Sequence, residues 1–188
     1  MDAFSFPQIP VVLSGPSLID VHRLEVATWG LIPHWTRNEE EALKLRTMTL
    51  NARSETMFTL SSFRSSAQIQ HCLVPINGFY EYQHLNMDGQ PDPKGKKTKK
   101  YLVTLEGKEA FFLGGLWSIW NHQITFTIVT MPACALMSEI HNTKQRQPII
   151  LSYDKAESWL SPRIAQEMGT FLEDQRELPL IAKVVSNL

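Results

Sequence analysis

The chain switches between short apolar stretches and polar breaks along most of its length. Apolar runs of four to eight residues, or alternating apolar and polar residues, predict strands. The clearest alternation is in residues 124–130, where Ile124, Phe126 and Ile128 lie on one side and Val129 lies opposite with threonines. The same reasoning predicts extended segments at residues 24–29, 71–74, 79–83, 101–105, 110–113, 148–151 and 180–185, and a short edge strand at 11–13.

Helical periodicity and end signals predict several short helices. Residues 39–46 mix apolar and charged positions as an amphipathic helix does. Ser61 or Ser62 is suited to cap a second helix that ends at Gln70. We expect three more helices: one to about Ile140 with Pro132 in its first turn, one over residues 153–160 after Ser152, and one over residues 162–168 that stops at Gly169.

Turn signals separate the predicted strands. Residues 75–78 and the pair Gly107-Lys108 predict turns between the strands beside them. Residues 86–100 are polar and rich in lysine, glycine and proline, so we expect a solvated hairpin loop there. Many short strands mixed with short helices favour an α+β fold over alternating βαβ units. No repeat or long linker is visible, so we expect a single domain over residues 1–188.

The composition narrows the function only slightly. A length of 188 residues with 43% hydrophobic positions suits one packed domain. The net charge is −1, so any nucleic-acid site has to be a local basic patch. No apolar run approaches the ~20 residues of a membrane span, and no signal peptide is visible. We therefore expect a cytoplasmic protein with no membrane partner. We also expect a monomer, although no sequence feature sets the oligomeric state.

Cysteine and histidine spacing gives no sign of a metal site. Cys72 and Cys134 do not belong to a CxxC pair, and the six histidines show no HxxxH or HExxH spacing. We expect no metal and no cofactor. Cys72 falls in an apolar strand, where we interpret it as a small hydrophobic residue and not as a nucleophile.

Four segments carry a resemblance when they are considered together and in order. They read WGLIPHW (29–35), NARSET (51–56), CLVPINGFYEY (72–82) and IHNTKQRQPIIL (140–151). The chain resembles the SOS response-associated peptidase (SRAP) family, whose recurring words are WGLIPxW, NARxET, CxxPxxGFYEW and IHxRMPxxL. The resemblance spans nearly the whole chain and implies a curved, barrel-like core of mostly antiparallel strands flanked by short helices.

The resemblance also implies a function in DNA damage. SRAP proteins bind abasic sites in single-stranded DNA, and an N-terminal cysteine attacks the sugar aldehyde to form a thiazolidine crosslink. The family is also credited with autoproteolytic, peptidase-like activity. By this resemblance we expect single-stranded DNA with abasic sites as the partner, and association with the nucleoid when DNA is bound.

The family's site residues map onto this chain one by one. Glu81 and His141 match the acid/base pair, which dehydration of a carbinolamine requires, and Asn51 matches the orienting residue. We also expect five DNA contacts. Trp29, Pro33, Arg53 and Arg146 lie within the motifs, and Arg64 is a further candidate outside them. Trp35 is an alternative to Trp29 as a stacking surface.

Structural roles compete with each of these assignments. A glutamate on a solvated strand face is common, and a histidine at a helix end often binds backbone carbonyls. Asn51 could be a simple cap or turn residue, and Arg53 and Arg146 could be surface ion-pair partners. The motifs favour the functional roles.

The amino-terminal sequence departs from the family pattern. Members begin Met-Cys, whereas this chain begins Met1-Asp2 and reaches the Trp29 motif early, so the family's first strand and helix are expected to be absent. Three explanations stay open: a truncated chain, omitted leading residues, or a degenerate paralogue. Loss of an inner strand exposes a sheet edge, which weighs against the third. As written, the chain is expected to bind DNA or form an imine.

Two rival functions remain. One is an inert module that binds single-stranded DNA. The other is a small peptidase or hydrolase that uses Glu81 and His141, although no GxSxG motif supports it.

Overall fold

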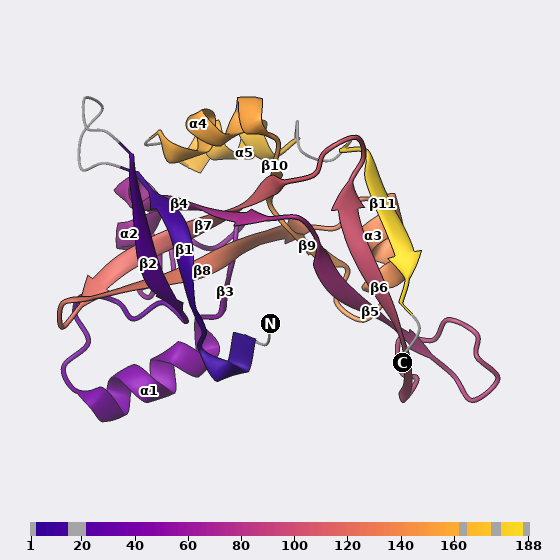
Figure 1. The fold of residues 1–188 in the computed structure, drawn as a ribbon. Helices are drawn as coiled ribbons and strands as arrows, with labels where there is room; N and C mark the ends of the chain where they lie inside the picture. Colours follow the sequence, from indigo (N-terminus) through magenta and orange to yellow (C-terminus); the bar gives the residue numbers. More distant parts are fainter. Residues whose placement is uncertain (1–2, 15–21, 162–164, 174–177, 186–188) are drawn as a thin grey trace.

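The computed structural model describes residues 3–14, 22–161, 165–173 and 178–185 (Figure 1). Its strands are β1 (Gln8–Leu13), β2 (Arg23–Trp29), β3 (Asn51–Arg53), β4 (His71–Ile76), β5 (Phe79–Leu85), β6 (Lys97–Leu105), β7 (Phe111–Trp120), β8 (Gln123–Pro132), β9 (Arg146–Pro148), β10 (Ile150–Leu151) and β11 (Leu180–Val184). Its α-helices are α1 (Glu39–Met48), α2 (Arg64–Ile69), α3 (Ala135–Ile140), α4 (Tyr153–Leu160) and α5 (Ala165–Glu173), and a 3-10 helix covers Ala3–Ser5.

The larger sheet closes on itself. Its strands follow the order β10-β7-β4-β1-β2-β8-β3, and an additional pairing of β7 with β8 joins β7, β4, β1, β2 and β8 into a five-stranded barrel. Most pairings are antiparallel, while β8 lies parallel to β2 and β3. The fold is therefore α+β with a barrel-like core and short helices, which confirms the expectation from the sequence.

Alternation along the barrel strands separates two hydrophobic cores. Phe126 and Ile128 of β8 join a cluster to which β1, β2, β4 and β7 also contribute, so these side chains fill the barrel interior. Val129 and Met131 of the same strand join a second cluster with residues of α2, α4 and α5. The predicted two-sided pattern of residues 124–130 is thus confirmed, and both of its sides are buried because helices cover the outer face.

Trp159 ties α4 to the outside of the barrel. Its indole Nε1 donates to the carbonyls of Cys72 (3.0 Å) and Gly115 (3.2 Å). The neighbouring Gly114 has no side chain, and a Cβ there would lie 2.9 Å from the indole ring. The approach of Trp159 to β7 therefore depends on glycine at that position.

A smaller sheet lies at one end of the barrel. Its order is β11-β6-β5, and both pairings are antiparallel. Leu105 of β6 packs into the barrel-interior cluster, and Phe79 of β5 packs against it. Figure 1 shows this sheet beside the barrel with α3 against it. The turn at Gly107 consequently connects two sheets and does not close a hairpin, because β6 and β7 pair with different partners.

Several predicted boundaries are wrong for identifiable reasons. Residues 11–13 belong to an inner strand, because β1 pairs with both β2 and β4. The loop expected over residues 86–100 ends early, because Lys97–Lys100 pair with β5. Pro132 ends β8 instead of starting a helix, and α3 begins only at Ala135.

Two predicted helix ends also differ. The helix α2 starts at Arg64 after a series of backbone-bonded turns, and it has no side-chain cap from Ser61 or Ser62. The helix α5 continues through Gly169 to Glu173, while residues 162–164 of that prediction lie outside the described residues. By contrast, α1 begins as capping rules require, since Asn38 Oδ1 accepts from the Glu41 amide at 2.9 Å. None of the described helices is long and apolar enough to cross a membrane.

Candidate functional site

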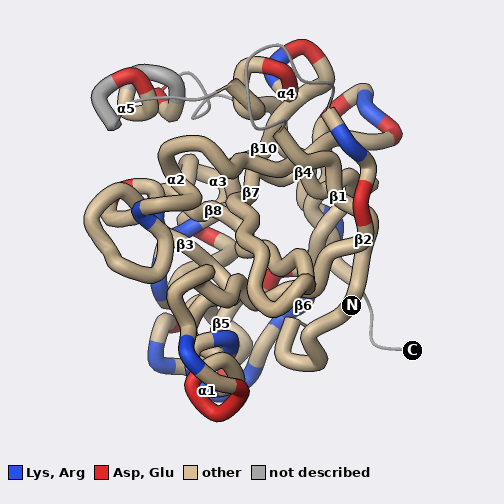
Figure 2. The backbone as a smooth tube through the Cα atoms, turned by 90° about the vertical axis from the view of Figure 1, so that its left-hand side faces the viewer, with Lys and Arg blue, Asp and Glu red and all other residues tan. Residues whose placement is uncertain are grey.

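A cleft of about 420 Å³ lies where the small sheet meets the barrel. It brings together six of the eight site residues expected from the sequence: Trp29, Asn51, Arg53, Glu81, His141 and Arg146. They come from β2, β3, β5, β9 and the end of α3, so the cleft depends on the whole fold. Acidic and basic residues are interspersed over the chain (Figure 2). The lining of the cleft holds the cations Arg53, Lys144 and Arg146 and one acidic residue, Glu81.

The short strand β3 presents two polar side chains together. Asn51 and Arg53 are exposed, whereas Ala52 between them is fully buried. Successive side chains of a strand point to opposite faces, so Asn51 and Arg53 share the face that lines the cleft. Pairing of β3 with β8 fixes this register, with Asn51 opposite Ile128 and Arg53 opposite Thr130.

Glu81 enters the cleft from β5. Its side chain is 21% exposed, while Tyr80 and Tyr82 on either side are more exposed. The Tyr82 amide donates to Glu81 Oε1 at 2.9 Å, which orients the carboxylate. The other oxygen, Oε2, lies 3.5 Å from His141 Nδ1. This carboxylate and imidazole are therefore adjacent at the cleft.

His141 occupies the C-cap of α3, where its amide donates to Met137 O at 2.8 Å. Its ring Nδ1 lies 2.9 Å from the carbonyl oxygen of Arg146. A carbonyl can only accept, so Nδ1 carries the hydrogen and Nε2 holds the lone pair in the neutral ring. Proton exchange with a ligand therefore falls to Nε2, while Glu81 is placed to stabilise the imidazolium.

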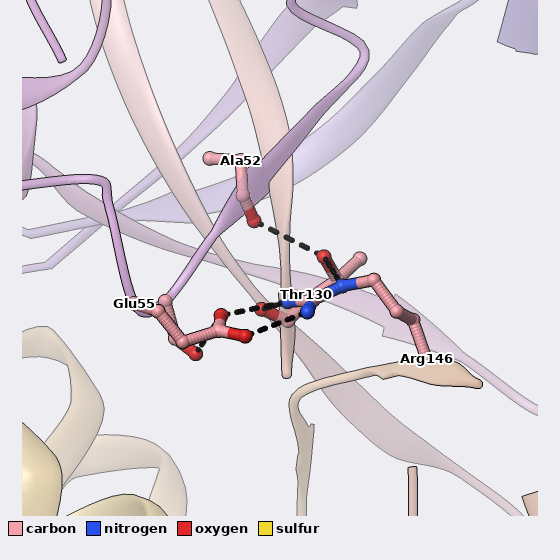
Figure 3. Close-up of polar contacts among 5 residues, drawn as sticks. Ala52, Glu55, Thr130 and Arg146 are labelled. Atoms are coloured by element: carbon pink, nitrogen blue, oxygen red, sulfur yellow. Dashed lines mark hydrogen bonds and ion pairs between the residues drawn. The ribbon is translucent and has the colours of Figure 1, made fainter. Parts of the chain in front are cut away.

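Arg146 is engaged by other protein groups (Figure 3). Its Nη1 and Nη2 donate to the two carboxylate oxygens of Glu55 at 2.7 and 2.8 Å. The same guanidinium donates to the hydroxyl and the carbonyl of Thr130. The hydrogen bond from Arg146 lowers the pKa of Glu55 to about 2, and the opposite charge adds to this effect. The ion-pair role considered for Arg146 is therefore present in the structure.

Trp29 forms an apolar wall of the cleft. Its Nε1 donates to Leu50 O at 2.7 Å, and its ring stacks on Phe126 at a centroid distance of 5.9 Å. These contacts fix the ring. Trp35 is not among the residues that line the cleft, although it is 40% exposed.

Two expected DNA contacts lie away from the cleft. Pro33 is buried in the turn after β2, where its carbonyl accepts from the Thr36 amide. Arg64 begins α2 and is exposed, but it does not line the cleft. The WGLIPHW motif thus contributes Trp29 to the site, while Pro33 has a structural role.

The structure adds Lys144 to the site. This exposed lysine lines the cleft within the loop between His141 and Arg146. That loop holds four residues here, whereas the family word IHxRMP has one residue between histidine and arginine. Asn142 anchors the loop on β5, since its side chain exchanges hydrogen bonds with the backbone of His84 at 3.0 and 2.9 Å. The extra residues between His141 and Arg146 were the sequence feature that could have indicated Lys144 as a site residue.

Neither cysteine lines the cleft. Cys72 is fully buried in the barrel, and burial raises the pKa of its thiol. Cys134 is partly buried and caps α3, where its amide donates to Gln147 Oε1 at 2.8 Å. Within the described ranges, no three histidine, cysteine or acidic side chains are grouped to hold a metal ion.

The barrel, the small sheet and the polar cleft between them define a known class of protein. The family model for "SOS response associated peptidase (SRAP)" matches residues 6–188. The chain belongs to the SRAP family.

Curated relatives and solved structures agree with this assignment. The abasic site processing protein YoqW of Bacillus subtilis is 33% identical over 147 residues, which cover 76% of this chain and 59% of YoqW. HMCES of Xenopus tropicalis, also named an abasic site processing protein, is 30% identical over 73% of this chain and 44% of its own length. A crystal structure from Bacteroides thetaiotaomicron superposes with a TM-score of 0.83 and 31% identity, covering all of this chain and 77% of that one. The chain thus spans about three fifths or less of the length of these two curated relatives.

Proposed function

We propose that this chain recognises an abasic site in single-stranded DNA and that its cleft promotes reaction of the sugar aldehyde with an amine. One observation carries the proposal: Glu81 Oε2 and His141 Nδ1 lie 3.5 Å apart in a cleft that also holds Asn51 and Arg53. The names of YoqW and HMCES support it, because both are abasic site processing proteins.

The proposed reaction needs proton transfers that this pair is suited to make. The amine nitrogen adds to the aldehyde carbon and gives a carbinolamine, which loses its hydroxyl group as water to form an imine. In the addition, His141 Nε2 accepts one proton from the nitrogen and the imidazolium passes it to the carbonyl oxygen, which becomes the hydroxyl. In the dehydration, the second proton of the nitrogen passes by the same route to the departing hydroxyl, which leaves as water. Glu81 stabilises the imidazolium between these steps, and Asn51 orients the sugar.

Binding of the strand is assigned to three other residues. Arg53 and Lys144 are exposed cations that line the cleft, and we assign to them the contacts with phosphates near the lesion. Trp29 supplies an apolar wall against which a neighbouring base can stack. Because the net charge of the chain is −1, a nucleic-acid site has to be a local basic patch, and these two cations supply one in the proposed function.

The crosslink of the family requires a thiol in addition. In the proposed full-length form, the thiol of an N-terminal cysteine adds across the imine: a carbon–sulfur bond forms and the thiol proton passes to nitrogen, which gives a thiazolidine. Ala3, near the amino-terminal end of the described chain, also lines the cleft. Peptidase activity, which the family description names, is assigned to the same pair.

Trapping on abasic DNA tests the proposal. The 188-residue chain is incubated with single-stranded DNA that carries one abasic site, with and without borohydride. We expect a borohydride-dependent adduct, because an imine is stable only after reduction. Glu81→Gln and His141→Ala should each slow trapping by about 100-fold. Glu139→Gln, on exposed α3 surface outside the cleft, is the matched control.

The outcomes separate the possibilities. A heat-stable adduct without borohydride would overturn the requirement for a thiol. Equal trapping by all the variants would overturn the roles of Glu81 and His141. Binding to intact and abasic strands without any trapping would favour an inert binding module, a second candidate that is supported because neither cysteine lines the cleft.

A further inference from the structure

The guanidinium of Arg146 has little capacity left for a phosphate. An arginine has five N–H hydrogens. Four of them are used: two on Glu55, one on Thr130 Oγ1 at 3.1 Å and one on Thr130 O at 2.8 Å. The end of the guanidinium faces Glu55 and its side faces Thr130. A phosphate can bind in the usual two-pronged way only if Glu55 leaves.

Glu55 is itself held in place. Ser54 Oγ donates to its Oε2 at 2.9 Å, in addition to the two bonds from Arg146. The arginine side chain of this pair is only 14% exposed. Ser54 follows β3 directly, and its amide donates to Thr130 O on β8 at 2.9 Å. The pair therefore joins the end of β3, the strand β8 and the start of β9.

The backbone beside Arg146 holds His141 in turn. The Arg146 carbonyl accepts from His141 Nδ1 at 2.9 Å, and the Gln145 amide donates to His141 O at 2.9 Å. The next residue, Gln147, binds the Cys134 amide at the other end of α3. Both ends of α3 thus rest on residues 145–147. The backbone pairing of β9 with β8 holds these residues, and the Arg146 side chain adds its bonds to Thr130 and Glu55.

We infer that the Glu55–Arg146 ion pair is a positioning element for His141, and that Arg146 does not bind phosphate. The pair holds the Arg146 carbonyl where it selects the Nδ1–H form of His141, which leaves the lone pair of the neutral ring on Nε2. The role of His141 in catalysis rests on the proposed function. The selection of the ring form does not, because it is a property of the free protein.

Nitrogen NMR of the free protein tests the positioning role. Long-range proton–nitrogen correlations of the His141 ring, assigned with His141→Asn, report which nitrogen carries the hydrogen. We expect the Nδ1–H form in the wild type and a mixture of forms in Glu55→Gln and Arg146→Gln. The same mixture should slow borohydride trapping by about tenfold. Variants that keep the pure Nδ1–H form would overturn the inference, whether or not abasic DNA reacts.

Salt-dependent binding of intact single-stranded DNA tests whether Arg146 binds phosphate. A lost phosphate contact lowers the slope of log affinity against log salt by about 0.7 for single strands. We expect that change for Arg53→Gln and an unchanged slope for Arg146→Gln. If Arg146→Gln instead lowers the slope as Arg53→Gln does, Arg146 is a phosphate contact and the inference fails. Glu55→Gln covers the case in which Arg146→Gln does not fold. A steeper slope than in the wild type would mean that Arg146 binds phosphate only once Glu55 has released it, which supports the inference. A shallower slope would contradict it.

Discussion

Glu55 and Arg146 meet through two parallel hydrogen bonds of 2.7 and 2.8 Å, and the carbonyl of the same arginine holds the ring of His141 at 2.9 Å. One residue therefore links the motif that contains Glu55 to the motif that contains His141. The two motifs lie far apart in the sequence, and the contacts of Arg146 explain why both are needed to build this site. The side chain of Arg146 contributes to the fold and its backbone contributes to the site.

Glu55→Gln should make the protein less stable at neutral pH and no less stable in acid. The folded pKa of Glu55, about 2, is below its ordinary value of 4.5. Its stabilisation is therefore complete above about pH 4.5 and is lost as the pH falls towards 2. Because the Glu55 side chain is 45% exposed, solvent screening limits the effect to about 1 kcal/mol. Urea unfolding of both proteins measures this difference, and a gap that persists unchanged at pH 2 would contradict it.

Lys144 should strengthen DNA binding through its charge alone. Lys144→Gln is expected to weaken binding of single-stranded DNA by roughly five- to tenfold at low salt, with little effect at high salt, because it removes one cation from the cleft. Lys144→Arg keeps the charge and should bind as the wild type does. Fluorescence anisotropy at several salt concentrations measures both. Equal affinity of the wild type and Lys144→Gln at low salt would remove Lys144 from the binding site.

Cys72 should resist thiol reagents until the protein unfolds. Its side chain is fully buried, and burial raises its pKa, so little thiolate exists to react. Cys134 is partly exposed and should react first. Labelling of the native protein followed by mass spectrometry of its peptides distinguishes the two. Rapid labelling of Cys72 in the native protein would contradict its interpretation as a buried, unreactive residue. Cys134→Ser, which leaves Cys72 as the single thiol, is the control.

The fold class was predictable from the sequence, but the connections between strands were not. The alternation of residues 124–130 fixed both faces of β8 correctly. Nothing local showed that β6 and β7, separated by the turn at Gly107, belong to different sheets. Strand pairing depends on which surfaces become buried together. β7 and β8 form a local hairpin, whereas the barrel closes through the parallel pairing of β8 with β2, which lies far away in the sequence. Lys97–Lys100 join β6 for the same reason: their partners on β5 lie outside any local window.

The site was predictable where a motif carried it and uncertain elsewhere. Asn51, Glu81 and His141 do meet at one cleft, although their chemical roles remain predictions. Pro33 has the same motif support as Trp29, but it is buried, and sequence order alone does not separate the two. The sequence left two partners possible for Arg146, DNA or an acidic side chain, because the order of charged residues does not show which carboxylate lies near in space. Glu55 becomes its neighbour only when β3 and β9 pair on either side of β8.

Trp29 and Trp35 should differ sharply in their effect on DNA binding. Only Trp29 lines the cleft, and stacking of a base on an aromatic ring contributes roughly 1–3 kcal/mol. Trp29→Ala should therefore weaken single-stranded DNA binding by about tenfold or more, while Trp35→Ala leaves it unchanged. Trp29→Phe keeps an aromatic wall and loses the bond to Leu50 O, so it should cost about 1 kcal/mol of stability with most of the affinity retained. Anisotropy and urea unfolding separate the two effects. Equal losses from Trp29→Ala and Trp35→Ala would mean that the strand follows a different path over the surface.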